Sequence, residues 1–186
     1  MDNKYYELHV TVLPQQVVDF ALFCKTVQAK PLYIQLDRGL HKNQLMLAAT
    51  NMLPDDVSAR AWADDYRLTV HQHFEVTRTK LESRLTEGPN EYYEAHWKLD
   101  FPYGDWECQI DSFLADKPHL LRSLNLFDPR IHYLSQRIYG SNDPITASRA
   151  FNASGVSINF GGLPLVKTHY ERCVWDSNPA LDFGWT

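Results

Sequence analysis

Two short segments of the chain pair a glutamate with a histidine in the same way. Tyr5-Tyr6-Glu7-Leu8-His9 returns later as Tyr92-Tyr93-Glu94-Ala95-His96. Residues two positions apart on a β-strand point to the same face, so each segment would place its carboxylate beside its imidazole. These are the side chains most used to move protons near neutral pH. The pattern therefore predicts four catalytic candidates, which are Glu7, His9, Glu94 and His96.

A second echo closes each half of the chain. Arg78-Thr79-Lys80-Leu81-Glu82 lines up with Lys167-Thr168-His169-Tyr170-Glu171. Two echoes in the same order indicate a duplicated unit. Because the repeated positions carry charged and imidazole groups as well as apolar ones, the duplication copies a chemical pattern and not only a core.

The elements that must position these side chains also repeat. Apolar periodicity in the first half predicts a strand at 5–12, a helix at 17–27, short strands at 32–36 and 44–50, a helix after Pro54 and a strand at 76–85. This order is the β-α-β-β-α-β motif. The second half shows a strand at 93–99, a helix at 106–114, a strand at 131–139, a helix from Pro144 to about Ala153 and a strand at 166–175.

We therefore predict an α+β fold of two tandem ferredoxin-like (β-α-β-β-α-β) repeats related by a pseudo-twofold. The alternative is a single larger sheet in which the two units join edge to edge. The first repeat is expected at residues 1–87 and the second at 91–175, and residues 176–186 are expected to form an irregular C-terminal tail.

In the ferredoxin-like fold the first and last strands of a unit are neighbours. That adjacency would bring the two echoes of each half onto one polar sheet face, with the helices on the opposite, apolar face. The charged, hydroxyl and imidazole groups around the catalytic candidates then become candidates for ligand binding. They are Tyr5, Thr11, Arg78, Lys80, Glu82, Tyr92, Lys98, Lys167, His169 and Glu171.

Two polar sheet faces have two common arrangements, and each implies a function. If they face each other they enclose a cavity, which favours an enzyme or enzyme-like protein that binds a small molecule or small anion. If they face solvent, cross-strand ion pairs such as Glu7 with Lys80 are sheet stabilisers, which favours a non-catalytic interaction module. The reaction, any cofactor and the oligomeric state stay open.

Metal binding and thiol chemistry have weaker support. His9, His96 and His169 could supply nitrogen ligands, but Glu-x-His on a strand is not a recognised ligand motif and the nearby lysines would repel a cation, so no metal site is predicted. Cys173 alternates with His169 and Glu171 on the last strand, although a buried, inert thiol is the commoner role for cysteine.

One motif resembles a known enzyme family. His9-Val10-Thr11-Val12 resembles the H-x-T-hydrophobic motif of the 2H phosphoesterases, which are bilobal and carry one such motif in each lobe. The resemblance implies that His9 and His96 act as general acid and base on a phosphodiester and that Thr11 binds phosphate. The second half departs from the motif, because Lys98 stands where the threonine is expected.

The composition limits the classes of partner that we expect. The chain of 186 residues has a formal net charge of −5 and no block of lysine and arginine, so nucleic-acid binding is not expected. The three cysteines are widely spaced, which is typical of reduced thiols. The N-terminus has no apolar leader and the chain has no long apolar run, so we expect a cytoplasmic protein that does not enter the membrane.

Overall fold

The computed structural model describes residues 3–101, 106–182 and 184. In the first half the elements are β1 (Lys4–Val12), α1 (Val17–Thr26), β2 (Lys30–Leu36), β3 (Asn43–Leu53), α2 (Asp56–His71) and β4 (Val76–Arg84). In the second half they are β5 (Tyr92–Asp100), α3 (Trp106–Leu114), β6 (Leu121–Asn125), β7 (Ile131–Tyr139), α4 (Pro144–Phe160) and β8 (Leu165–Asp176), followed by a short 3₁₀ helix, η1 (Pro179–Asp182).

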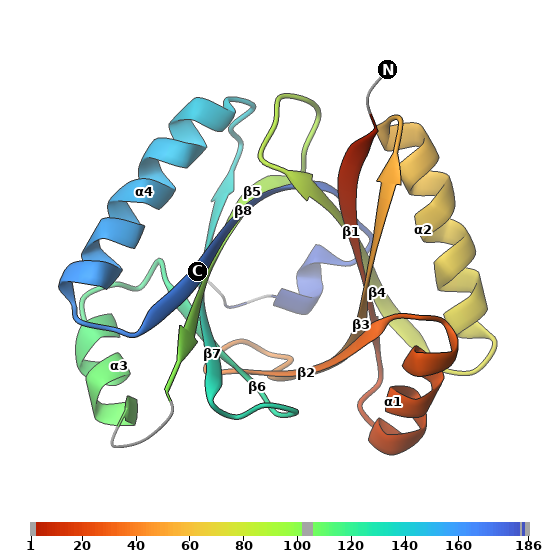
Figure 1. Ribbon diagram of the computed structural model, residues 1–186, viewed down its shortest axis with the longest axis horizontal. Coiled ribbons are helices and arrows are strands. Elements are labelled where there is room, and N and C mark those ends of the chain that lie inside the picture. The colour runs from red at the N-terminus through yellow and green to blue at the C-terminus, as the bar shows by residue number, and fades with distance from the viewer. Residues whose placement is uncertain (1–2, 102–105, 183, 185–186) are drawn as a thin grey trace.

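The strands of both halves form one closed barrel with the helices outside it (Figure 1). The order around the barrel is β1-β3-β2-β6-β7-β5-β8-β4, and every neighbouring pair is antiparallel. Two seams join the halves. At one seam β2 pairs with β6 through Ile34, Gln35 and Leu36, and at the other β4 pairs with β8.

The prediction of an α+β fold with two tandem ferredoxin-like repeats is wrong, because the described residues form a single closed eight-stranded barrel with four outer helices. The physical reason is the cost of exposed sheet edges. Two separate sheets would each leave two strands with unpaired backbone N–H and C=O groups, and pairing β2 with β6 and β4 with β8 removes those edges. The division at 1–87 and 91–175 stays a prediction.

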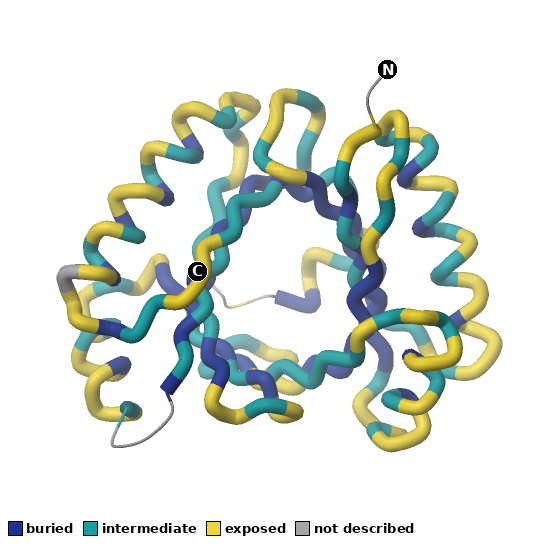
Figure 2. Tube along the Cα trace, in the orientation of Figure 1, coloured by how far each residue is buried: buried dark blue, intermediate teal, exposed yellow. Residues whose placement is uncertain are grey.

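The barrel is apolar on its outside and polar on its inside. Outward side chains of β1 and β5, such as Leu8, Val10 and Trp97, are buried beneath the helices in two separate apolar cores. Figure 2 shows the ring of strands mostly buried or half-buried, with exposed residues along the outer helices. The expectation that the helices cover the apolar faces is therefore confirmed, and the polar faces are left to line the interior.

α4, the last α-helix of the second half, is longer than predicted, because it continues through Gly155. Asp143 caps α4 by accepting hydrogen bonds from the backbone N–H groups of Ile145 and Thr146, and Pro144 is the first helical residue. We expected this helix to end near Ala153, but it continues to Phe160. A Cβ at Gly155 would lie 3.0 Å from Trp97 Nε1, so the glycine lets the helix pack closely on the barrel.

The segment expected to be an irregular tail has a definite place. β8 continues to Asp176, and η1 then lies across the far side of the ring in Figure 1. Leu181 and Asp182 are buried there. Phe183, Trp185 and Thr186 lie outside the described residues. Among the described residues, no helix is long and apolar enough to cross a membrane.

Candidate functional site

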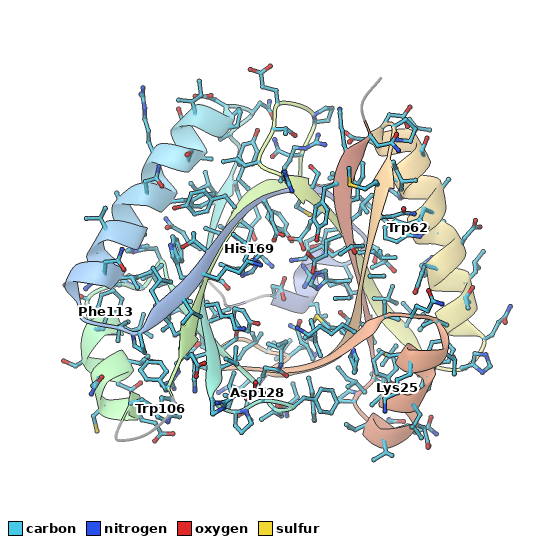
Figure 3. All side chains as sticks on the ribbon, viewed as in Figure 1. Lys25, Trp62, Trp106, Phe113, Asp128 and His169 are labelled. Atoms are coloured by element: carbon cyan, nitrogen blue, oxygen red, sulfur yellow. The ribbon has the colours of Figure 1, made fainter. Side chains whose placement is uncertain are left out.

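The polar faces line a cavity of about 770 Å³, whose lining also includes Trp62 and Tyr66 of α2. Figure 3 shows His169 inside the ring of strands. Most of the residues singled out from the sequence line this cavity: Tyr5, Glu7, His9, Thr11, Arg78, Lys80, Glu94, His96, Lys98, Lys167, His169 and Glu171. Glu82 and Tyr92 are not part of the lining; they are buried and contact residues that are.

One end of the cavity is closed by ion pairs between buried arginines and aspartates. Arg78 forms a two-point ion pair with Asp176 and also contacts Asp182 at 2.6 Å. Arg137 reaches the same Asp182 oxygen at 2.6 Å. The Tyr92 hydroxyl donates to Asp176 at 2.9 Å. The end of the barrel occupied by η1 is therefore held by hydrogen-bonded, charge-compensated groups.

A buried lysine holds the middle of the barrel together. Lys80 Nζ lies 2.8 Å from Glu82 and 2.9 Å from Glu94, and Arg137 Nε lies 3.1 Å from the other Glu94 oxygen. Burial acts to raise the pKa of Glu94, but Arg137 and Lys80 outweigh it and hold that pKa well below its usual range. Glu94 is therefore an ionised structural group rather than a proton donor at neutral pH.

The two repeated histidines have different surroundings. His9 Nε2 lies 3.2 Å from Glu7 and 3.5 Å from Glu82, and its Nδ1 lies 3.5 Å from the sulfur of Met46. Burial acts to raise the pKa of Glu7, but the hydrogen bond and the charge of His9 lower it to about 2. His9 is thus held between two carboxylates, one of which stays ionised.

His96 sits between a hydroxyl and two carboxyl groups. Its Nδ1 lies 2.7 Å from Ser135 Oγ, and its Nε2 lies 3.6 Å from both Glu94 Oε1 and Glu171 Oε2. Burial lowers the pKa of His96 below its usual 6.5, against the opposing effect of Glu94. Burial and the negative charges of Glu82 and Glu7 raise the pKa of Glu171 well above its usual 4.5. The imidazole therefore favours its neutral form, and the neighbouring carboxyl favours its protonated form.

The other end of the cavity carries two lysines that form no ion pair with any of the residues that the structure describes. Lys98 on β5 is the cross-strand partner of Lys167 on β8 and of Tyr133 on β7. Directly paired residues share one face of a sheet, so these side chains lie together on the inner face. One step further in, His96 pairs with His169. Burial and Lys167 lower the pKa of His169, so it favours the neutral form.

A group of possible metal ligands exists, but a cation already occupies it. Ligand atoms of Glu82, Glu94 and His96 lie within 4.8 Å of one another. The ammonium group of Lys80 bridges the two carboxylates, so a metal ion would have to displace it. Thiol chemistry finds no support either, because burial raises the pKa of Cys173 above its usual value and keeps the thiol protonated.

Several lining residues were missed from the sequence. Tyr133, Ser135 and Arg137 alternate along β7 on the inner face, opposite Lys98, His96 and Glu94. The strand itself was predicted, and alternation along it was the signal that could have identified these residues. Asp182 gave no such signal, because it lies in the segment expected to be irregular.

Comparison with known proteins assigns no family. No protein-family model and no curated protein matches the sequence. Among solved structures, the crystal structure of a proposed monooxygenase from Lactobacillus acidophilus NCFM is similar at a TM-score of 0.32 and 11% sequence identity, over 93% of this chain and 93% of that chain. A similarity at this level carries no argument about the activity of this chain.

Proposed function

We propose that the chain is an enzyme that binds a small molecule in the barrel cavity and transfers protons to and from it, with His96 as general base and Glu171 as general acid. The observation that carries the proposal is the 3.6 Å separation of His96 Nε2 and Glu171 Oε2 inside the cavity. A neutral base beside a protonated acid can take a proton from one atom of a ligand and give a proton to another.

Such a step balances its protons without another reactant. The ligand loses one proton to His96 and gains one from Glu171, which is the balance of a tautomerisation or isomerisation. The pair returns to its starting state when the proton on His96 passes back to Glu171, directly or through a water molecule. In the tautomer in which Nδ1–H donates to Ser135, Nε2 keeps the lone pair that a base needs, and it faces Glu171 and Glu94, each at 3.6 Å.

His9 suits a positioning role better than the role of a second base. Its Nε2 is hydrogen-bonded to Glu7 at 3.2 Å, so a ligand would have to break that bond to reach the nitrogen, whereas the two carboxyl groups near His96 Nε2 lie beyond hydrogen-bond distance, at 3.6 Å. The same carboxylates bear on the phosphodiesterase alternative. A phosphodiester bound between His9 and His96 would meet Glu7, Glu82 and Glu94, and like charges at such distances repel.

The non-catalytic alternative accounts for some of the polar groups. Lys80, Arg78 and Arg137 are fully engaged in buried ion pairs, as expected of structural residues. It accounts for the hydrogen bond of His96 to Ser135 but not for the placement of Glu171 beside His96, at a separation too long for a hydrogen bond. These two residues are therefore the ones by which catalysis and a purely structural interior can be told apart.

Hydrogen exchange into a carbon acid tests the proposal. The probe is 2-tetralone, an uncharged two-ring ketone, and the readout is loss of its C1 proton signal in D₂O by NMR. We expect the protein to accelerate exchange above the buffer rate and His96→Ala to remove at least about 100-fold of that acceleration, because general bases contribute on this scale. Glu171→Gln should remove a similar part.

The control removes an imidazole of the same kind from outside the cavity. His119 is exposed in the loop before β6, so His119→Ala should exchange like the native protein. If native protein, His96→Ala and His119→Ala all exchange the ketone at the buffer rate, or if the two histidine variants lose equal activity, the proposed acid–base pair is wrong.

A further inference from the structure

The two ends of the cavity carry corresponding residues of the duplicated sequence. Arg78 corresponds to Lys167, and Thr11 corresponds to Lys98, when the two echoes are aligned. Both seams of the barrel are antiparallel, so corresponding strands of the two halves run in opposite directions. Equivalent residues therefore lie at opposite ends: Thr11 and Arg78 at the end that η1 closes, and Lys98 and Lys167 at the other.

At the closed end the chain supplies its own carboxylates. Asp182 of η1 contacts Arg78 and Arg137, each at 2.6 Å, and accepts a hydrogen bond from Gln44. Asp182 is only 5% exposed, so this carboxylate is a built-in anion that completes a cationic site. Among the described residues, η1 occupies this end of the barrel and not the other.

At the open end the corresponding cations have no such partner. In the part of the chain that the structure describes, neither Lys98 nor Lys167 has a carboxylate within ion-pair distance. Both line the cavity, together with the neutral-favouring His169, whose ring can donate one hydrogen bond. Two ammonium groups side by side repel each other, so an anion between them would be bound favourably.

The wall between the two ends is partly apolar. β2 and β3 contribute Leu32, Ile34, Leu36 and Met46 to this wall. Tyr133 of β7 lies beside Lys98 of β5. His96 lies two residues from Lys98 along β5, a spacing of roughly 6–7 Å. A ligand that contacts both must therefore carry its anionic group about one ring away from the atom that meets His96.

We propose that the ligand is an amphipathic anion whose carboxylate binds Lys98 and Lys167 at the open end, in the way that Asp182 binds Arg78 and Arg137 at the closed end. Its apolar body lies against β2 and β3, and its far polar atom reaches His96 and Glu171. This inference rests on the proposed function for the role of the far end, but the anion site itself depends only on the lysines and the cavity.

A matched pair of probes isolates the anionic group. The probes are 6-hydroxy-2-naphthoate and 6-hydroxy-2-naphthamide, which differ in charge and hardly in shape, and binding is measured by calorimetry. We expect the carboxylate to bind about tenfold more tightly than the amide, as one charge-assisted contact provides. In Lys98→Gln/Lys167→Gln the preference should disappear, while the affinity for the amide should change by less than about twofold.

Lys25 provides the control, because it is exposed on α1 and lies away from the cavity in Figure 3. Lys25→Gln should keep the full preference for the carboxylate. If the native protein binds both probes equally, binds neither, or loses the preference in Lys25→Gln as well, the anion site is wrong. These results are independent of 2-tetralone exchange: retained exchange with no carboxylate preference refutes the ligand class alone, and lost exchange with the preference retained refutes the acid–base pair alone.

Discussion

Removing the ammonium group of Lys80 should destabilise the barrel strongly and in a pH-dependent way. Lys80 is buried and lies 2.8 Å from Glu82 and 2.9 Å from Glu94. Methionine has a similar length without the charge, so Lys80→Met removes the cation with little loss of packing. The two carboxylates are then left facing each other in the interior, where Glu94 keeps Arg137 at 3.1 Å and, among the described residues, Glu82 keeps only the imidazole of His9, at 3.5 Å.

The expected cost at pH 7 is about 3–5 kcal/mol in the free energy of unfolding, the range for deleting one partner of a buried ion pair. Lys80 helps to hold the pKa of Glu94 well below its usual value in the folded protein. An acid with a lowered folded pKa stabilises the fold above its unfolded pKa and loses that contribution as pH falls. The difference between native protein and Lys80→Met should therefore be full above about pH 5 and shrink as pH falls further.

Urea denaturation at pH 7 and pH 4 measures both effects. The double variant Lys80→Met/Glu82→Gln is the matched control, since it also removes the carboxylate that loses its nearest cation, and it should recover about half of the loss. A cost below about 1 kcal/mol for Lys80→Met at pH 7, or a cost that is the same at pH 4 and 7, would show that Lys80 does not compensate buried charge as described.

Three further perturbations separate structural residues from site residues. Trp97→Ala should lower the free energy of unfolding by about 3–5 kcal/mol, because Trp97 is fully buried against Phe151 and Tyr170. His96→Ala should lower it by about 1 kcal/mol or less, and equal losses in thermal or urea unfolding would make His96 a core residue. Glu171→Gln should be more stable than the native protein at pH 7, with the gap closing at pH 4, because a carboxyl whose folded pKa is raised loses stability as pH rises through 4.5; a less stable variant at pH 7 contradicts this. His132 is buried between Phe101 and Trp106, and burial lowers its pKa to about 4. The native free energy of unfolding should therefore fall by about 2 kcal/mol from pH 6.5 to pH 4. His132→Phe should reduce this pH dependence, and an unchanged dependence would assign it to other groups.

Much of the site was readable from the sequence because strand alternation and duplication are local signals. The echoed glutamates and histidines fall on β1 and β5, and the predicted adjacency of first and last strands is confirmed by the pairing of β1 with β4 and of β5 with β8. Alternation assigns each side chain to a face, and the echo shows which faces carry the same chemistry.

Barrel closure was not readable, because it depends on contacts between distant segments. β6 was missed, because it is only five residues long, carries Arg122, Ser123 and Asn125, and lies between Pro118 and Pro129, residues that disfavour a continuous strand. That short strand forms one of the two seams. η1 was missed for a similar reason, since nothing local shows that Asp182 meets Arg78 across the barrel.

The contrast between His9 and His96 also depends on tertiary contacts. Their sequence contexts are nearly the same, but β3 brings Met46 beside His9 and β7 brings Ser135 beside His96. Duplication therefore predicted an equivalent pair, whereas the surroundings make one histidine a partner of two carboxylates and the other a base with an adjacent acid.

An NMR titration of Glu171 and His96 in the unliganded protein tests the central claim most directly. The side-chain carboxyl carbon of Glu171, assigned by comparison with Glu171→Gln, and the ring nitrogens of His96 are followed over pH 3–9. We expect Glu171 to titrate well above 4.5 and His96 below 6.5, so that a protonated acid and a neutral base coexist at pH values above the pKa of His96 and below the pKa of Glu171. A Glu171 that titrates at or below 4.5, together with a His96 that stays protonated above 6.5, would make the pair an ordinary ion pair and would contradict the account.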